Sequence, residues 1–70
     1  MNFSTALENM KAGMRVGRPS WVGAWVSVEY PASSSDMTVP YLYVKMIDGE
    51  KMPWTPDHED LFAEDWVSVN

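Results

Sequence analysis

The side chains best suited to chemistry are concentrated in the segment 51–66, KMPWTPDHEDLFAEDW. The segment holds two tryptophans, the only histidine of the chain and five carboxylates, namely Asp57, Glu59, Asp60, Glu64 and Asp65. An acid/base pair would need two of these carboxylates at a defined separation and in different environments. The same spacing suits the first turn of a helix, where the helix dipole favours negative charge, followed by a solvated face. The pattern favours the helix, and the catalytic pair stays an alternative.

His58, the only histidine of the chain, could act as a proton shuttle. A nucleophile site would need a serine, a cysteine or a second histidine beside it, and a lone histidine is more typical of an exposed or hydrogen-bonded side chain. The four glycines form no phosphate-binding loop, and no spacing of His, Cys and Asp resembles a metal site. We therefore expect a protein that is not an enzyme and that carries no cofactor or metal.

Trp21 and Trp54 are the second candidate feature. Each stands close to a proline at the end of a predicted element, where the aromatic walls of a base-binding pocket are commonly placed. Burial in the core is the equally weighted alternative for both.

The elements that must position these residues can be predicted from periodicity. Phe3, Ala6, Leu7 and Met10 follow helical spacing and predict a helix at 2–12, with Asn2 or Ser4 as its cap and Gly13 as its stop. Strands are predicted at 14–18, 24–30, 41–47 and 50–54, with a tight turn at Asp48-Gly49, a polar loop at 31–39 and an extended Val-Ser-Val ending.

Three details of burial and capping follow from the same patterns. Met14 and Val16 should lie on the buried side of the first strand, and Val26, Val28 and Tyr30 on one face of the second. A short second helix should start with Thr55 as cap and Pro56 in its first position. The tetrapeptide WVSV occurs at 25–28 and 66–69, which suggests two strands of similar one-sided burial. Together these elements predict an α+β fold: a single domain over 1–70, with an antiparallel sheet of four to five strands, an N-terminal helix and a short second helix before the last strand.

Length and composition set limits on partners. A chain of 70 residues without cysteine has a thin core. Four Trp, three Tyr, two Phe and six Met exceed what that core can hide, so we expect an oligomer with some of these side chains at an interface or in a ligand cleft. The net charge of −5 argues against a nucleic-acid binder, and no apolar run would span a membrane. The expected protein is soluble and cytoplasmic.

The two ends of the chain resemble a known family. NFSTALENMKAGMRVGRPSW is similar to the family's N-terminal helix, Gly, Val-x-Arg and Trp, and DGEKMPWTPDHEDLFAEDW is similar to its Asp-Gly hairpin, Pro-Trp and Ala-Glu-Asp-Trp close. The family is the phage anti-Thoeris family of the signal-sponge type, the second kind described. The resemblance implies a non-enzymatic phage protein that sequesters a cyclic ADP-ribose-type signal, or another cyclic nucleotide, in the host cytoplasm. It also implies a homotetramer with ligand pockets between protomers.

The resemblance further implies roles for single residues. Trp21 and Trp54 would be stacking walls, Arg18 would contact phosphate, and Asp60 would contact ribose or adenine. His58 lies in an Asp-His-Glu run where the family commonly has a Ser-Gln-Thr-like run, and it is included among the candidate ligand contacts. Val22 likewise replaces a common polar residue. The competing function is an acidic inhibitor of host defence or nucleic-acid machinery, in which the 57–65 carboxylates stand in for phosphates.

Overall fold

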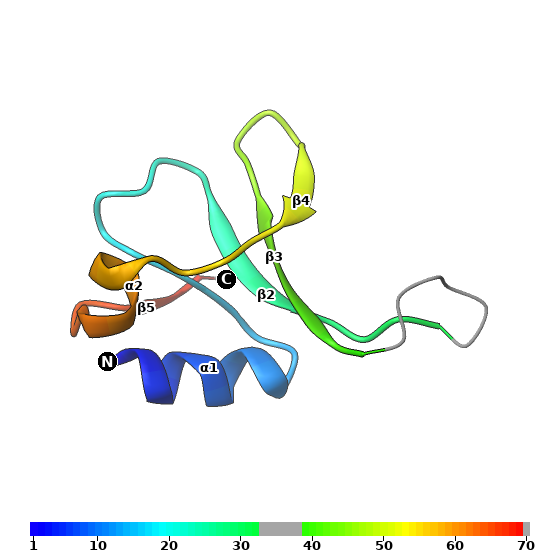
Figure 1. The fold of residues 1–70 in the computed structure, drawn as a ribbon. Coiled ribbons are helices and arrows are strands. Elements are labelled where there is room, and N and C mark those ends of the chain that lie inside the picture. The colour runs from blue at the N-terminus through cyan, green and yellow to red at the C-terminus, as the bar shows by residue number, and fades with distance from the viewer. Residues whose placement is uncertain (33–38, 70) are drawn as a thin grey trace.

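The computed structural model describes residues 1–32 and 39–69, and it has an α+β architecture (Figure 1). Its elements in chain order are α1 (Phe3–Lys11), β1 (Arg15–Gly17), β2 (Trp25–Glu29), β3 (Tyr41–Lys45), β4 (Lys51–Pro53), α2 (His58–Phe62) and β5 (Val67–Val69). The strands form one antiparallel sheet in the order β4-β3-β2-β1-β5. The predicted fold class, with its N-terminal helix and its short helix before the last strand, is confirmed.

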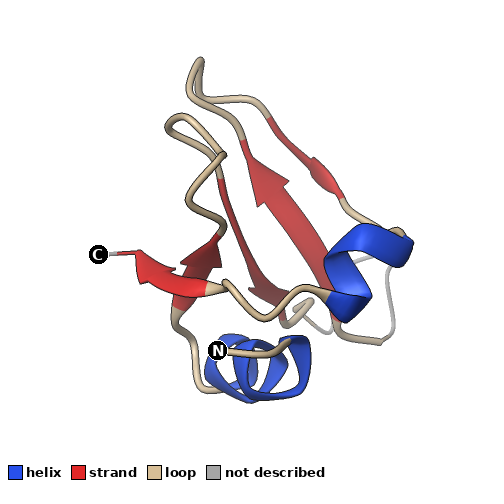
Figure 2. Cartoon of the chain, turned by 90° about the vertical axis from the view of Figure 1, so that its left-hand side faces the viewer, coloured by secondary structure: helices blue, strands red, loops and turns tan. Residues whose placement is uncertain are grey.

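Helix α1 forms where the apolar spacing predicts it. The side chain of Asn2 caps it by accepting a hydrogen bond from the Thr5 backbone N–H at 2.9 Å. Ala6 and Met10 are fully buried against the sheet, and Phe3 and Leu7 are partly buried beside them. The helix therefore lies across one face of the sheet, as Figure 2 shows with α1 seen nearly end-on below the strands. None of the helices within 1–32 and 39–69 is long and apolar enough to cross a membrane.

The strand register sets which residues share a face. Val16 pairs with Val26, and Val26 pairs with Val44, so these three side chains point to the same side. They form the core with Ala6, Met10 and Trp66. The β3–β4 hairpin is the predicted one: the Asp48 carboxylate accepts a hydrogen bond from the Glu50 N–H at 2.9 Å, and Gly49 has a φ of +93°.

Two burial predictions are wrong. Met14 lies before β1, because pairing starts only at Arg15, and its side chain is exposed. Tyr30 lies beyond the end of β2, is exposed, and donates its hydroxyl to the Lys11 carbonyl at 2.8 Å. Ser27 lies on the face opposite Val26 but is also buried, and its hydroxyl donates a hydrogen bond to the Met14 carbonyl at 2.7 Å. Of the predicted loop at 31–39, residues 33–38 lie outside the described residues.

The predicted cap of the second helix is also wrong. The cap of α2 is Asp57, so Thr55 and Pro56 precede the helix. Asp57 Oδ1 accepts a hydrogen bond from the Asp60 N–H at 3.0 Å, and Asp60 Oδ2 accepts one from the Asp57 N–H at 3.2 Å. This reciprocal capping box satisfies two backbone donors, which a Thr55 cap would leave to other partners.

The two WVSV segments are both extended, but their burial differs. The pairing of β1 with β2 places Trp25 on the face opposite the core, and Trp66 is 1% exposed inside the core. The prediction of similar burial is therefore wrong. Trp66 is also held by the chain start: the Met1 amine donates to the Trp66 carbonyl at 2.8 Å, and the Trp66 N–H donates to the Met1 carbonyl at 3.0 Å.

Candidate ligand-binding site

Trp21 and Trp54 lie far apart in sequence and meet in the fold. Their ring centroids are 6.1 Å apart with an interplanar angle of 77°, which is an edge-to-face contact. Trp66 lies beneath both, with centroids 5.4 Å from Trp21 and 6.2 Å from Trp54. The buried indole of Trp66 therefore supports both half-buried rings through direct contact.

These two rings line an open cavity of about 350 Å³, here named the tryptophan pocket. Its lining residues are all apolar: Trp21, Val22, Ala24, Val44, Met46 and Trp54. Val44 comes from the core face of β3, and Ala24 immediately precedes β2. A pocket with aromatic walls and no charged lining group suits a flat, uncharged ring such as a nucleobase.

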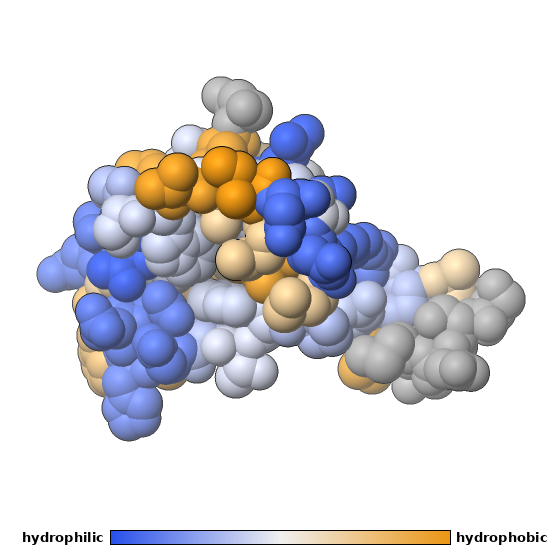
Figure 3. Space-filling view, turned by 90° about the horizontal axis from the view of Figure 1, so that it is seen from above, coloured by the Kyte–Doolittle hydropathy of each residue, from blue (hydrophilic) through white to orange (hydrophobic). Residues whose placement is uncertain are grey.

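The end of the molecule that carries this pocket is apolar on its surface as well. Val22 is 79% exposed and Ile47 is 71% exposed, and Met46 and Met52 are also exposed. Figure 3 looks down on this end and shows a strip of hydrophobic residues with polar residues at its side. These four residues, named the apolar rim from here on, give the pocket a border with little affinity for water.

Gly23 fixes the loop that carries Trp21 and Val22. It has a φ of +70°, and a Cβ built there would lie 2.7–2.9 Å from side-chain atoms of Ile47. Only glycine combines this left-handed backbone with so close an approach. The loop at 18–24 is therefore pressed directly against the β3–β4 hairpin, and the two segments lie together at the top of Figure 1.

Arg18 and Asp60, both predicted site residues, bind each other. Arg18 Nη1 lies 3.4 Å from Asp60 Oδ1, and Arg18 Nε donates to Asp65 Oδ1 at 3.0 Å. The Asp65 hydrogen bond is the largest cause that raises the pKa of Arg18, and Asp60 adds to it. The arginine therefore faces two carboxylates of its own chain, and neither Arg18 nor Asp60 lines the tryptophan pocket.

His58 is exposed in the first position of α2 and does not line the tryptophan pocket. The Asp57 carboxylate before it has a lowered pKa, first because the Asp60 N–H donates a hydrogen bond to it. The structure thus assigns Asp57 and Asp60 to helix capping. The described residues hold no group of three or more His, Cys, Asp and Glu side chains that could bind a metal ion.

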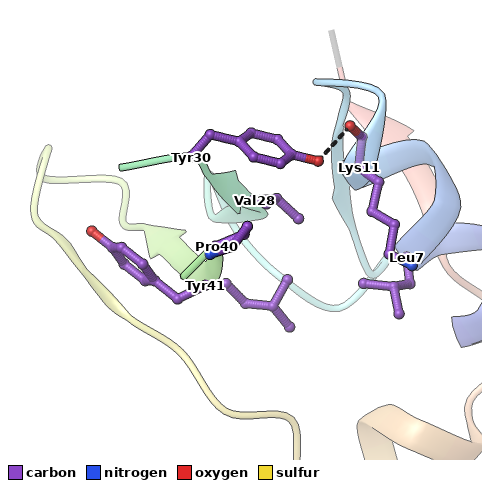
Figure 4. A pocket seen from close by; sticks show the side chains of 7 residues that line it. Leu7, Lys11, Val28, Tyr30, Pro40 and Tyr41 are labelled. Carbon is purple, nitrogen blue, oxygen red and sulfur yellow. Dashed lines mark hydrogen bonds between the residues drawn. The ribbon is translucent and has the colours of Figure 1, made fainter. Parts of the chain in front are cut away.

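A second cavity of about 370 Å³ lies at the end of α1, and Figure 4 shows it from close by. This helix-end pocket is lined by Leu7, Lys11, Val28, Tyr30, Pro40, Tyr41 and Leu42. Tyr30 closes one side through its hydrogen bond to the Lys11 carbonyl, drawn as the dashed line. None of the residues that the sequence singles out for ligand contact lies here.

The outer face of the sheet carries a third cluster of aromatic and charged groups. Trp25 contacts Tyr43 edge to face at 5.8 Å. The Arg15 guanidinium lies 4.9 Å from the Trp25 ring centroid, and the Lys51 ammonium lies 4.3 Å from that of Tyr43. Lys51 also pairs with Glu29. Because cations already cover both rings, this face offers a poorer stacking surface than the tryptophan pocket.

Sequence reasoning missed several residues that build the site. Ala24, Val44 and Met46 complete the lining, and Asp65 is the closest partner of Arg18. Val44 and Met46 carry no signal beyond a strand pattern, because which strand end meets the tryptophans depends on the sheet order. Asp65 was visible as part of the acidic cluster, but its partner lies 47 residues earlier.

Comparison with known proteins gives two matches. The family model of the Tad2-like domain, described as the Thoeris anti-defense 2-like domain, matches residues 1–69. A curated protein of Bacillus phage SP01, named Thoeris anti-defense 2, is 30% identical to the chain over an alignment of length 85, which covers 100% of this chain and 96% of the relative.

Proposed function

The chain belongs to the Thoeris anti-defense 2-like family of phage anti-defence proteins, and from this premise we propose that it binds and sequesters a cyclic ADP-ribose-type or other cyclic nucleotide signal of the bacterial host without turnover. The observation that carries the proposal is the edge-to-face pair of Trp21 and Trp54 on the wall of an apolar cavity of about 350 Å³. A nucleobase fits this environment, since its ring gains stacking and dispersion contacts and loses little hydration.

The pocket accounts for the base of such a ligand and leaves its phosphates outside. All six lining residues are apolar, and a phosphate placed among them would lose its hydration without a compensating donor. The ligand therefore enters base first, and its phosphates stay outside the apolar lining, where water or another protomer supplies the donors.

The apolar rim supports the second part of the proposal, a homotetramer with shared pockets. Val22, Met46, Ile47 and Met52 are exposed together beside the pocket, and contiguous exposed apolar residues are typical of protein interfaces. A second copy placed over the rim would cover these residues and close the pocket. The same copy would bring polar groups to the phosphates that the first copy cannot hold.

Sequestration is a matter of affinity and stoichiometry, so the proposal needs no catalytic group. His58 is exposed and stands apart from the tryptophan pocket, and Asp57 and Asp60 are engaged in the helix cap. The protein would act in the host cytoplasm, where the signal is made, and would release its ligand chemically unchanged.

One combined experiment tests the proposal. The purified protein is titrated calorimetrically with a panel of cyclic ADP-ribose isomers and cyclic dinucleotides, its mass is measured by light scattering, and the ligand is recovered by heating and weighed by mass spectrometry. We expect saturable binding of at least one compound, a mass of four chains and an intact ligand. No binding across the panel contradicts sequestration, a monomer mass contradicts the shared pocket, and a cleaved ligand contradicts the absence of turnover.

The surface of α2 favours a second candidate function, inhibition of a host protein. Phe62 is 82% exposed and Leu61 is 46% exposed, and the carboxylates of Glu59 and Glu64 stand close to them in sequence. An apolar anchor with acidic neighbours fits a basic protein surface. Phe62→Ala separates the two functions, because it should abolish inhibition of such a protein and leave nucleotide binding unchanged.

A further inference from the structure

We infer that Arg18 is a positioning residue, which holds the two tryptophan walls of the pocket at their spacing, and that it is not the contact to ligand phosphate. The inference rests on the proposed function only for the identity of the ligand. Its structural basis is the set of contacts that joins the loop at 18–24 to α2.

The guanidinium of Arg18 already binds two carboxylates of its own chain. It donates to Asp65 at 3.0 Å and to Asp60 at 3.4 Å, and its side chain is only 17% exposed. The Asp60 side chain is 13% exposed and is fixed further by the capping box of α2. A phosphate would have to compete with two carboxylates of the same chain, one of them held rigidly in place.

The position of Arg18 is transmitted to the first wall through the backbone. The Trp21 N–H donates to the Arg18 carbonyl at 2.9 Å, which closes a tight turn between the two residues. A movement of Arg18 away from α2 therefore moves Trp21. At the other end of the loop, Gly23 packs on Ile47, so the loop is held at both ends.

The second wall is linked to the same ion pair. Asp60 follows Trp54 by six residues, and its carbonyl accepts a hydrogen bond from the Trp66 indole N–H at 3.0 Å. The Trp66 ring in turn contacts both Trp21 and Trp54. The contacts from Arg18 through Asp60 and Trp66 therefore return to the loop at 18–24 and form a closed network at the base of the pocket. In this network the ion pair of Arg18 and Asp60 joins the loop to α2.

The two roles of Arg18 make opposite predictions for Asp65→Ala. If Arg18 contacts phosphate, removing a competing carboxylate frees the cation, and binding stays equal or becomes tighter. If Arg18 is a positioning residue, the same change loosens the loop at 18–24 and weakens binding. Asp65 is 54% exposed at its side chain, so the variant is expected to fold. Glu64→Ala is the matched control, because it removes the neighbouring carboxylate and the same charge without touching Arg18.

The experiment combines a measurement without ligand and one with ligand. Near-ultraviolet circular dichroism reports the coupling between the contacting indoles, and a calorimetric titration with a cyclic ADP-ribose isomer reports affinity. For Asp65→Ala we expect a changed tryptophan spectrum and binding weakened by about three- to fivefold, as for a partly exposed ion pair. Glu64→Ala should match the parent protein in both. Arg18→Lys, which keeps the charge but loses the planar fork, should behave like Asp65→Ala.

An unchanged spectrum in Asp65→Ala overturns the inference, and so does binding that is equal to or tighter than that of the parent. If the parent protein binds no cyclic nucleotide, the proposed function fails, and the spectra alone then decide whether Arg18 sets the spacing of the tryptophans.

Discussion

The tryptophan pocket and the helix-end pocket are nearly equal in volume, at about 350 and 370 Å³, and both are lined mainly by apolar side chains. They differ in how their walls are held. Trp21 and Trp54 contact each other, and both contact the buried ring of Trp66. The lining of the helix-end pocket combines the rings of Tyr30 and Tyr41 with aliphatic and flexible side chains such as Leu7 and Lys11, and one hydrogen bond from Tyr30 spans it.

Cavity volume is therefore a poor guide to a binding site, and the contacts that hold the wall side chains in place are a better one. A ring has only two side-chain torsions, and edge-to-face contacts restrict both, so little freedom is lost when a ligand enters. A lysine, with its longer flexible side chain, loses more on ordering. The walls of the tryptophan pocket are therefore held in place by the fold itself, and the following variants test this difference between the two pockets.

The largest effect is expected from Trp66→Ala, which removes the buried ring that contacts both Trp21 and Trp54. Trp66 is 1% exposed and donates to the Asp60 carbonyl, so the change leaves a cavity and an unpaired acceptor. Truncation of a buried tryptophan costs about 3–5 kcal/mol. The loss should be visible as a lower urea midpoint. A variant as stable as the parent would show that Trp21 and Trp54 do not depend on Trp66 for their packing.

Trp54→Ala should weaken binding of a cyclic nucleotide by about ten- to a hundredfold, because stacking of one base on a ring is worth about 1–3 kcal/mol. Calorimetric titration measures the loss. Trp25→Ala is the matched control: it removes the same side chain from the outer face of the sheet, and it should leave affinity unchanged. Equal effects of the two variants on affinity would mean that Trp54 does not line the ligand site.

Gly23→Ala should both destabilise the fold and weaken binding, because the new Cβ would meet Ile47 at 2.7–2.9 Å and the backbone has a φ of +70°. Gly13→Ala is the matched control, since it has a φ of +92° with nothing within 4 Å of the new Cβ. The left-handed backbone alone costs roughly 1–2 kcal/mol. Thermal unfolding and titration of both variants isolate the contact with Ile47, and an equal loss in the two would show that this contact is not needed.

The smallest effect is expected at the helix-end pocket. Tyr30→Phe removes the hydrogen bond to the Lys11 carbonyl, which is worth about 0.5–1.5 kcal/mol. Stability should fall slightly in a denaturant titration while nucleotide affinity is unchanged. A drop in affinity comparable to that of Trp54→Ala would instead place the ligand at the end of α1 and reverse the comparison.

Much of the fold follows from local pattern. The spacing of Phe3, Ala6, Leu7 and Met10 places α1 within one residue at either end, and the Asp48-Gly49 turn gives the β3–β4 hairpin. Capping was less predictable, because Thr55 and Asp57 are both good caps and only the reciprocal contact with Asp60 selects one. Element ends depend on such contacts more than on the residue types.

The candidate site was predictable in part. Trp21 and Trp54 were singled out by their position beside prolines, and the fold brings them into one pocket. The pairing of Arg18 with Asp60 and Asp65 was not predictable, because an ion pair across more than forty residues has no local signal. The expected contact of Arg18 with phosphate came from the family resemblance, and nothing in the local sequence indicated that two carboxylates of the same chain bind this side chain.

The two WVSV segments show most directly which features follow from the sequence alone and which depend on the tertiary structure. The sequence by itself determined that both are extended, because β-branched residues and alternation favour a strand wherever they occur. It did not determine which face each tryptophan occupies. Residues alternate between faces along a strand, so the register with β1 decides: it places Trp25 on the outer face, where Arg15 covers it, and Trp66 in the core next to the tryptophan pocket.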